Sequence, residues 1–293
     1  MSTVRHLLGL IRFSHTIFAL PFALLSAVLA WQSEPFRGLD LVGILLCMIF
    51  ARSAAMAFNR ITDRRIDAAN PRTQNRHLPS GKLSLRTVVL FTLITSGGFV
   101  ASTLLFLYRE PSNPWPLMLS VPVLLFVLAY SLTKRFFALT HFWLGASLML
   151  APLAAWIAIR GLVELETPLL IGAGVFFWVA GFDMLYSCQD VEFDRQAKLF
   201  SVPAWIGVRA TLRLAFVCHV LMLIAMFALG YVSPFLGMVY FVGLGILAVI
   251  LLVQHWLVSP NDLSRVNAAF FWVNGLVSIG LFALVLLQVV VGV

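Results

Sequence analysis

The sequence predicts an all-α polytopic membrane protein with about nine helices that cross the bilayer. Hydrophobic residues make up 61% of the 293 residues, charged residues make up only 11%, and the mean hydropathy is +0.98. A soluble domain carries about 25% charged residues. Continuously apolar runs of ~20 residues, each able to cross ~30 Å of hydrocarbon as a helix, recur along the chain. Because these runs do not alternate between apolar and polar residues, they argue against the strands of a membrane barrel.

The predicted spans follow one another closely, at residues 16–31, 41–58, 87–108, 115–132, 136–159, 167–186, 212–231, 234–255 and 268–291. The first span also has features of a signal sequence, but the eight spans behind it favour a retained anchor. No connection is long enough for a separate soluble core. We therefore expect a single transmembrane domain over residues 1–293.

The basic residues predict how the chain is oriented. With the N-terminus on one side of the membrane, that side carries sixteen Lys and Arg residues, against only Arg37, Arg109 and Arg160 on the other. Positive charge concentrates in cytoplasmic loops. We therefore expect the N-terminal side to face the cytoplasm of a cell whose inner or plasma membrane holds the protein. The net charge of +8 is then no indication of nucleic-acid binding.

The cysteines and histidines do not predict a metal or disulfide framework. Cys47, Cys188 and Cys218 lack metal-ligand spacing and lie in or beside apolar segments. The six histidines are scattered along the chain. We expect the cysteines to be packing residues and expect neither zinc nor haem.

Two long polar connections on the predicted cytoplasmic side, residues 59–86 and 187–211, mark the expected functional face. In the first, Asn59, Asp63 and Asp67 are spaced i, i+4, i+8, so on a helix they form one polar stripe. A second stripe has spacings of 3, 4 and 4 and consists of Asp183, Tyr186, Asp190 and Asp194. The shared Asp-x-x-x-Asp spacing, offset by 127 residues, suggests two similar half-sites.

These stripes could be merely solvated helix ends, but two charges argue against that interpretation. Asp183 and Arg52 fall inside apolar spans, where a charged side chain is costly and usually faces a functional cavity. Arg52 lies seven residues before Asn59, two turns deeper on the same helix face. Glu192 points away from its stripe, so we expect it to be a bystander.

The residue types in the two stripes predict a metal-bridged polyphosphate. Clustered carboxylates repel one another unless a cation neutralises them. Carboxylate and carboxamide oxygens are hard ligands that suit Mg²⁺. Basic residues accompany both motifs: Arg72, Arg76, Lys134, Arg135 and Lys198. Mg²⁺ can link a carboxylate to a phosphate while Arg and Lys bind the remaining oxygens.

The first motif continues as Pro71-Arg72-Thr73-Gln74-Asn75-Arg76-His77-Leu78-Pro79-Ser80-Gly81. Together with the second stripe, this run closely resembles the UbiA superfamily of intramembrane prenyltransferases, and over nearly the whole chain it is most similar to the 4-hydroxybenzoate polyprenyltransferase branch. The resemblance implies helices around a central cavity, Mg²⁺ as cofactor, a polyprenyl diphosphate and a small aromatic acceptor as substrates, and a lipid bilayer as surroundings. The family's first motif often begins Asn-Asp, whereas Arg60 replaces that Asp here.

The resemblance also implies roles for residues of this chain. The ligands of two Mg²⁺ ions would be Asn59, Asp63, Asp67, Asp190 and Asp194, of which the four aspartates are the expected catalytic residues. The diphosphate oxygens would be contacted by Arg72, Arg76, Lys134 and Lys198. We further expect the acceptor and prenyl pocket to include Arg12, Arg52, Asp183 and Tyr186. An arginine there could pair with an acceptor carboxylate, and aromatic side chains could shield an allylic cation.

The expected reaction is transfer of a polyprenyl group to 4-hydroxybenzoate in ubiquinone or menaquinone biosynthesis. Residues 12–21 look like those of relatives proposed to act in menaquinone synthesis, which leaves prenylation of a dihydroxynaphthoate open. A transporter would also place charges between helices, but it gives no reason for two matched aspartate stripes at one face. A membrane phosphotransferase would have a single longer Asp-Gly…Asp motif, which this chain lacks.

Overall fold

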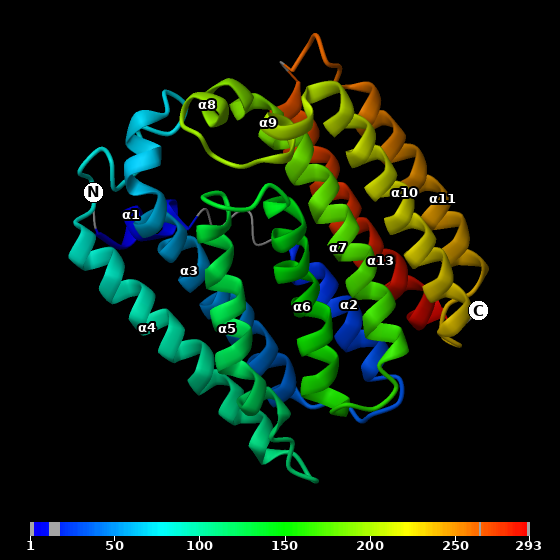
Figure 1. Ribbon diagram of the computed structural model, residues 1–293. Helices are drawn as coiled ribbons and strands as arrows, with labels where there is room; N and C mark the ends of the chain where they lie inside the picture. The colour runs from blue at the N-terminus through cyan, green and yellow to red at the C-terminus, as the bar shows by residue number, and fades with distance from the viewer. Residues whose placement is uncertain (1–2, 12–17, 264, 292–293) are drawn as a thin grey trace. The chain divides into compact units, whose positions relative to one another are not determined.

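The computed structural model describes residues 3–11, 18–263 and 265–291, which are overwhelmingly helical (Figure 1). Eight of these helices are long and apolar enough to cross a membrane, which confirms eight of the nine predicted spans. Within the first predicted span, the described residues form α2 (Leu20–Ala30), an apolar helix of 11 residues. At a rise of 1.5 Å per residue, α2 covers about 16 Å, roughly half of a ~30 Å hydrocarbon layer.

The chain divides into two compact units, and the first comprises Met1–Thr16 and Arg37–Thr133. Its elements are α1 (Thr3–Leu10), α3 (Gly38–Ala69), α4 (Leu85–Thr103), the 3-10 helix η2 (Leu104–Tyr108) and α5 (Trp115–Thr133). Helices α3 and α4 lie side by side (Figure 1). A Cβ added at Gly98 of α4 would lie 2.9 Å from the ring of Phe50 on α3, so the absence of a side chain allows this close approach.

At the end of α3 opposite the aspartate motif, an ion pair joins the first turn of α3 to the residue that follows η2. The fully buried Asp40, in the first turn of α3, accepts a hydrogen bond from Arg109. Arg37 lies 3.8 Å from the same carboxylate and donates to the carbonyl oxygen of Tyr108 at 2.8 Å. The pair neutralises a carboxylate that would otherwise be buried without compensation.

Unit 2 comprises Ile17–Phe36 and Lys134–Val293. Its long helices are α6 (Thr140–Arg160), α7 (Glu166–Ser187), α10 (Val208–Val232), α11 (Met238–Trp256) and α13 (Asn274–Val291). Its short elements are α2, the 3-10 turn η3 (Cys188–Asp190), α8 (Val191–Gln196), α9 (Val202–Ile206), α12 (Val266–Ala268) and the π-helical η4 (Ala269–Val273). The expected single transmembrane domain stays a prediction.

Helix α7 is the most buried of the eight spans, and glycines bring its neighbours close. A Cβ added at Gly145 of α6 would lie 2.4 Å from the carbonyl oxygen of Phe176 on α7. A Cβ at Gly181 of α7 would lie 2.5 Å from Nε2 of His219 on α10. Because no side chain separates the backbones, α6 and α10 both pack tightly against α7.

Apolar side chains also cover the outer faces of the long helices. On α11, for example, Val242, Ile246 and Val249 are exposed at helical spacing. Such faces suit the hydrocarbon of a bilayer. The three cysteines are free, with Cys188 and Cys218 buried.

Candidate active site

The first predicted stripe lies on the last turns of α3, the helix that runs from Gly38 to Ala69. The helix continues well past Phe58, where the sequence predicted its apolar span to end. Asn59 Nδ2 donates to Asp63 Oδ2 at 2.9 Å, one turn along the helix. Both side chains are half-buried. The predicted i, i+4 relationship is therefore a direct contact, and it orients the Asp63 carboxylate.

Asp67, the third member of the stripe, is buried between two arginines. Arg76 Nη1 donates to Asp67 Oδ1 at 2.6 Å, and Arg60 Nη1 lies 3.4 Å from Oδ2. Arg60 precedes Asp67 by two helical turns, so both side chains project from one face. Thr73 Oγ1 also donates to the backbone carbonyl of Asp67 at 3.0 Å, which secures the following loop.

The loop after α3 is built from consecutive turns that begin at Asn70. Asn70 Oδ1 accepts from the amide of Arg72 at 2.9 Å, and the carbonyl of Thr73 accepts from the amide of Arg76 at 2.9 Å. Ser80 Oγ then donates to the carbonyl of Arg76 at 2.7 Å. These bonds fix the backbone that carries both predicted diphosphate-binding arginines of this loop.

A cavity of about 260 Å³ opens beside this loop, wholly within unit 1. It is lined by Gly9, Leu10, Arg60, Arg72, Thr73, Asn75, Arg76 and His77. Three guanidinium groups and an imidazole therefore face one small space. Such a donor set suits a polyanion, because arginine binds phosphate oxygens in a bidentate manner.

The pKa of His77 reflects the same excess of positive charge around the cavity. Burial lowers the pKa of His77 from its ordinary value of 6.5, and the positive charges of His6, Lys82 and Arg60 lower it further. The rings of His6 and His77 meet edge to face, with centroids 5.6 Å apart. An anion in the cavity would offset this repulsion.

Of the two arginines predicted for the acceptor pocket, only Arg52 lies within the described residues, and its role stays a prediction. Arg52 lies on α3, seven residues before Asn59, and is half-buried, as the prediction of a charge within an apolar span requires. Arg12 lies outside the described residues, so its predicted role stays a prediction.

The second predicted stripe lies where α7 passes through η3 into α8. Asp183 and Tyr186 belong to α7, Asp190 ends the 3-10 turn, and Asp194 belongs to α8. Asp190 and Asp194 are 8% and 2% exposed, whereas Glu192 is exposed. The stripe residues Asp190 and Asp194 are therefore buried and Glu192 is not, as its spacing predicts. The stripe does not lie on one continuous α-helix, because the 3-10 turn η3 separates α7 from α8.

Asp194 provides a test of whether this motif suits a cation. Its Oδ2 is buried and has no hydrogen-bond partner among the described residues. A buried carboxylate oxygen without a partner is costly unless a positive charge compensates it. No three His, Cys, Asp or Glu side chains in the described ranges are already gathered as a metal site. The unsatisfied oxygen nevertheless fits the hard-ligand chemistry of Mg²⁺.

Lys198 occupies a backbone position that normally favours glycine. Its φ of 54° is left-handed. The amide of Leu199 donates to the carbonyl of Asp194 at 2.8 Å, and the amide of Lys198 donates to that of Arg195 at 3.2 Å. These bonds form a Schellman motif that ends α8. A lysine there accepts backbone strain, which is common where a side chain serves a function.

Lys134, the other predicted lysine, lies beside the same segment. Its carbonyl accepts a hydrogen bond from the amide of Phe200 at 2.8 Å. The chain segments that carry Lys134 and Lys198 are therefore joined within unit 2.

Asp183 and Tyr186 have separate surroundings on α7. His141 Nδ1 lies 2.7 Å from Asp183 Oδ2. Tyr186 is half-buried and packs against a small apolar cluster that includes Val258 and Val266. Phe182 belongs to an aromatic group, with its ring centroid 4.9 Å from that of Trp178.

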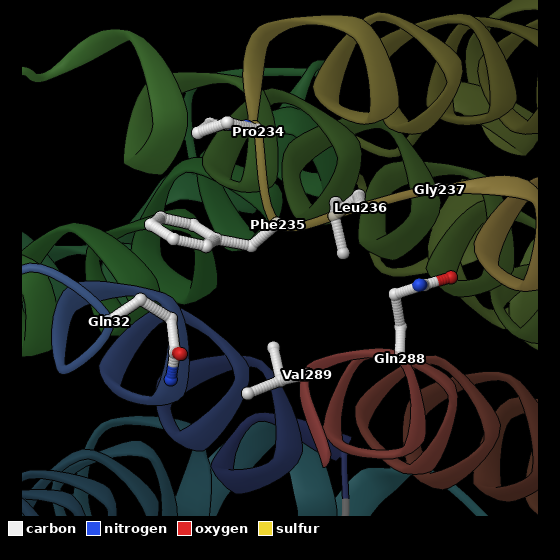
Figure 2. Close-up of a pocket in the computed structure, with 7 residues that line it drawn as sticks. All are labelled: Gln32, Pro234, Phe235, Leu236, Gly237, Gln288 and Val289. Carbon is white, nitrogen blue, oxygen red and sulfur yellow. The ribbon is translucent and has the colours of Figure 1, made fainter. Parts of the chain in front are cut away.

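A second cavity, of about 270 Å³, lies in unit 2 but contains none of the predicted residues. Figure 2 shows Gln32, Phe235, Leu236, Gln288 and Val289 around it. Gln288 Oε1 accepts from the amide of Tyr240 at 3.0 Å, which satisfies the first turn of α11. Because this cavity offers amides and apolar side chains rather than charges, it is not the candidate active site.

Three residues that line the unit 1 cavity or contact a predicted residue were not themselves predicted. Arg60 could have been found, because residues seven apart share a helix face. His77 stands in the motif beside Arg76, but nothing in the sequence places its ring in the cavity. His141 is 42 residues from Asp183, and a lone histidine gives no signal of such a contact.

Comparisons with known proteins connect this geometry to a family. Residues 19–276 match the UbiA prenyltransferase family. The chain is 30% identical over 253 residues to 4-hydroxybenzoate octaprenyltransferase of Nitrosospira multiformis, covering 85% of this chain and 84% of the relative. It is 29% identical over 258 residues to the protein of the same name from Methylobacillus flagellatus, covering 86% and 84%.

Solved structures agree with that similarity. The apo structure of a UbiA homolog from Aeropyrum pernix K1 has a TM-score of 0.83 and 32% identity, covering 94% of this chain and 98% of the homolog. A UbiA homolog from Archaeoglobus fulgidus, bound to DMAPP and Mg²⁺, has a TM-score of 0.73 and 18% identity, covering 97% and 99%. The second likeness is one of fold alone.

Proposed function

Because this chain belongs to the UbiA prenyltransferase family, we propose that it transfers a polyprenyl group from a polyprenyl diphosphate to 4-hydroxybenzoate, as an integral membrane enzyme. The observation that carries the proposal is the cavity of about 260 Å³ that three arginines and a histidine line beside the Asp67 carboxylate. A space that offers both carboxylate and guanidinium groups suits a metal-bridged diphosphate. The names of the relatives from Nitrosospira and Methylobacillus support the acceptor.

The arginines and lysines bind the diphosphate in this proposal. Arg72 and Arg76 donate to its oxygens from the loop after α3, and Lys134 and Lys198 contribute two ammonium groups. Before a substrate binds, Arg76 and Arg60 are each paired with the Asp67 carboxylate. A diphosphate that enters the cavity competes with Asp67 for these guanidinium groups. The carboxylate is then released to serve as a cation ligand.

Five residues would hold Mg²⁺: Asn59, Asp63, Asp67, Asp190 and Asp194. When bound, the metal supplies positive charge that stabilises the departing diphosphate. The hydrogen bond from Asn59 holds Asp63 in one orientation before any ligand arrives. The unpartnered Oδ2 of Asp194 supports the same assignment, because a cation would satisfy it.

The reaction exchanges one bond for another. The allylic C–O bond breaks and its electron pair leaves with the diphosphate oxygen. A carbon of the acceptor ring, ortho to the hydroxyl group, attacks the allylic cation, and a C–C bond forms. The ring proton then leaves to restore aromaticity. Tyr186 is our candidate to shield the cation with its π face.

The acceptor carboxylate is recognised by Arg52 in this proposal. A guanidinium paired with a carboxylate in a dry site is strong and geometrically selective. Arg12 is proposed for the same role from the predicted cytoplasmic entrance. Both motifs and the entrance are proposed to face the cytoplasm, since sixteen of the nineteen loop cations lie on their side of the predicted topology.

An acceptor panel tests this function. Purified protein, a polyprenyl diphosphate and Mg²⁺ are combined with 4-hydroxybenzoate, its carboxamide analogue or a dihydroxynaphthoate, for wild type and Arg52→Gln. We expect wild type to prefer the acid and Arg52→Gln to lose most of that preference. Equal turnover of acid and carboxamide would remove the charge-pairing argument. A preference for the naphthoate would assign the chain to menaquinone synthesis instead.

A further inference from the structure

A buried histidine contacts the carboxylate of Asp183. His141 lies in the first turn of α6 and its side chain is fully buried, whereas the Asp183 side chain is 18% exposed. Nδ1 of His141 lies 2.7 Å from Oδ2 of Asp183. Asp183 is thus held at Oδ2, and its side chain keeps some exposed surface.

The second ring nitrogen of His141 determines which way the hydrogen bond runs. Nε2 lies 3.4 Å from the backbone amide of Val202, and an amide N–H can only donate. Ser187 Oγ is also 3.5 Å from Nε2, but it donates to the carbonyl of Met184 at 2.9 Å. Nε2 is therefore the accepting nitrogen of a neutral ring. The proton sits on Nδ1, which donates to Asp183.

The fold fixes the position of His141 from three directions. Gly145, one turn further along α6, brings that helix against the backbone of α7 at Phe176. Val202 begins α9, which follows the loop that carries Lys198. The imidazole therefore links α6, α7 and the segment after α8, all within unit 2.

We propose that His141 is the positioning residue of Asp183. By donating from Nδ1 it holds the carboxylate in one rotamer, with Oδ1 turned to accept a hydrogen bond from a hydroxyl-bearing aromatic ligand. The inference rests on the proposed function, in which Asp183 belongs to the acceptor pocket. His141 itself touches neither substrate, because its side chain has no exposed surface.

Three substitutions of His141 separate positioning from packing. In His141→Asn, the amide nitrogen stands near the former Nδ1 and can still donate to Asp183. In His141→Gln, the donor lies near the former Nε2 instead. His141→Leu keeps the volume but donates nothing. His219→Leu is the matched control, because His219 is another buried histidine of unit 2 and contacts His255 rather than Asp183.

The readouts are kcat and KM for both substrates, together with the thermal unfolding midpoint of each variant. For His141→Leu we expect kcat/KM for the acceptor to fall on the order of 10- to 100-fold, as for loss of a hydrogen bond to a charged group. The KM for the prenyl diphosphate should remain within about twofold, since His141 bonds Asp183 rather than any of the four proposed diphosphate-binding side chains. His141→Asn should recover most of the loss, and His141→Gln should not.

A double variant completes the test. In an Asp183→Asn background, His141→Leu should cost little further, because the group it positions is already gone. Wild-type acceptor kinetics in folded His141→Leu would overturn the proposal, as would equal losses in the Asn and Leu variants. If wild type itself prenylates no aromatic acceptor, the proposed function fails instead. The two failures are therefore distinguishable.

Discussion

Asp67 and Arg76 are nine residues apart and joined by an ion pair of 2.6 Å, while Arg60 approaches the other Asp67 oxygen at 3.4 Å. Asp194, the last aspartate of the second motif, has a buried oxygen with no partner among the described residues. Both aspartates are proposed cation ligands, yet their metal-free surroundings are opposite. Asp67 is paired with two arginines, whereas one oxygen of Asp194 lacks a hydrogen-bond partner in the described part of the chain.

This contrast predicts opposite effects on stability from one chemical change. In the absence of metal, Asp67→Asn should lower the thermal unfolding midpoint, because two guanidinium groups lose their counterion. Asp194→Asn should leave the midpoint unchanged or raise it, because it replaces a buried carboxylate that has an oxygen without a hydrogen-bond partner. Thermal unfolding in detergent with a chelator measures both. Midpoints that fall equally would show that Asp194 is compensated by the protein.

We predict that Lys198 lowers the stability of the fold but supports turnover. Lys198→Gly relieves a left-handed backbone and should stabilise the fold by about 1 kcal/mol. Turnover should nevertheless fall by about tenfold or more if the ammonium group binds the diphosphate. Lys198→Asn is the control, since Asn tolerates this conformation and also lacks the charge. Full activity in both variants would remove Lys198 from the diphosphate site.

His77 predicts a pH dependence of stability. Because its pKa is lowered from 6.5 in the folded chain, the unfolded chain binds more protons below that pH. Stability should therefore fall as the pH decreases from 6.5 towards the folded pKa. In His77→Gln this part of the decline should be absent. Unfolding midpoints measured at a series of pH values from neutral to mildly acidic test the prediction, and identical slopes in both proteins would contradict it.

The topology can be tested by cysteine labelling. The three native cysteines are free and can be replaced before single cysteines are introduced at the exposed Gln74 and Ala197. A membrane-impermeant reagent should label both positions only after the cytoplasmic side is made accessible. Labelling of intact cells from outside would falsify the orientation derived from the basic residues.

Much of the candidate site could be predicted from the sequence because it depends on residues that are close to one another along the chain. The i, i+4 spacing of Asn59 and Asp63 is a direct hydrogen bond on α3. The spacing of Glu192 predicted its separation from the stripe, and it is exposed where Asp190 and Asp194 are buried. Helical periodicity determines such relationships, so no tertiary information was needed.

The contacts that depend on distant segments could not be predicted in this way. His141 reaches Asp183 only because α6 and α7 approach closely at Gly145. The left-handed backbone of Lys198 follows from the cap at the end of α8, although lysine does not favour that conformation. The bond from Arg60 to Asp67, by contrast, follows from helical periodicity, because residues seven apart share a helix face.

The central claim is metal-dependent prenyl transfer by the two aspartate motifs, and one measurement tests it most directly. Purified protein is given a polyprenyl diphosphate and 4-hydroxybenzoate, with Mg²⁺ or a chelator, and both prenylated product and released diphosphate are quantified. We predict equimolar release only with Mg²⁺, a loss of about 100-fold or more in Asp190→Asn, and near wild-type turnover in Glu192→Gln. Product formed with chelator, or inactivation by Glu192→Gln while Asp190→Asn remains active, would contradict the account.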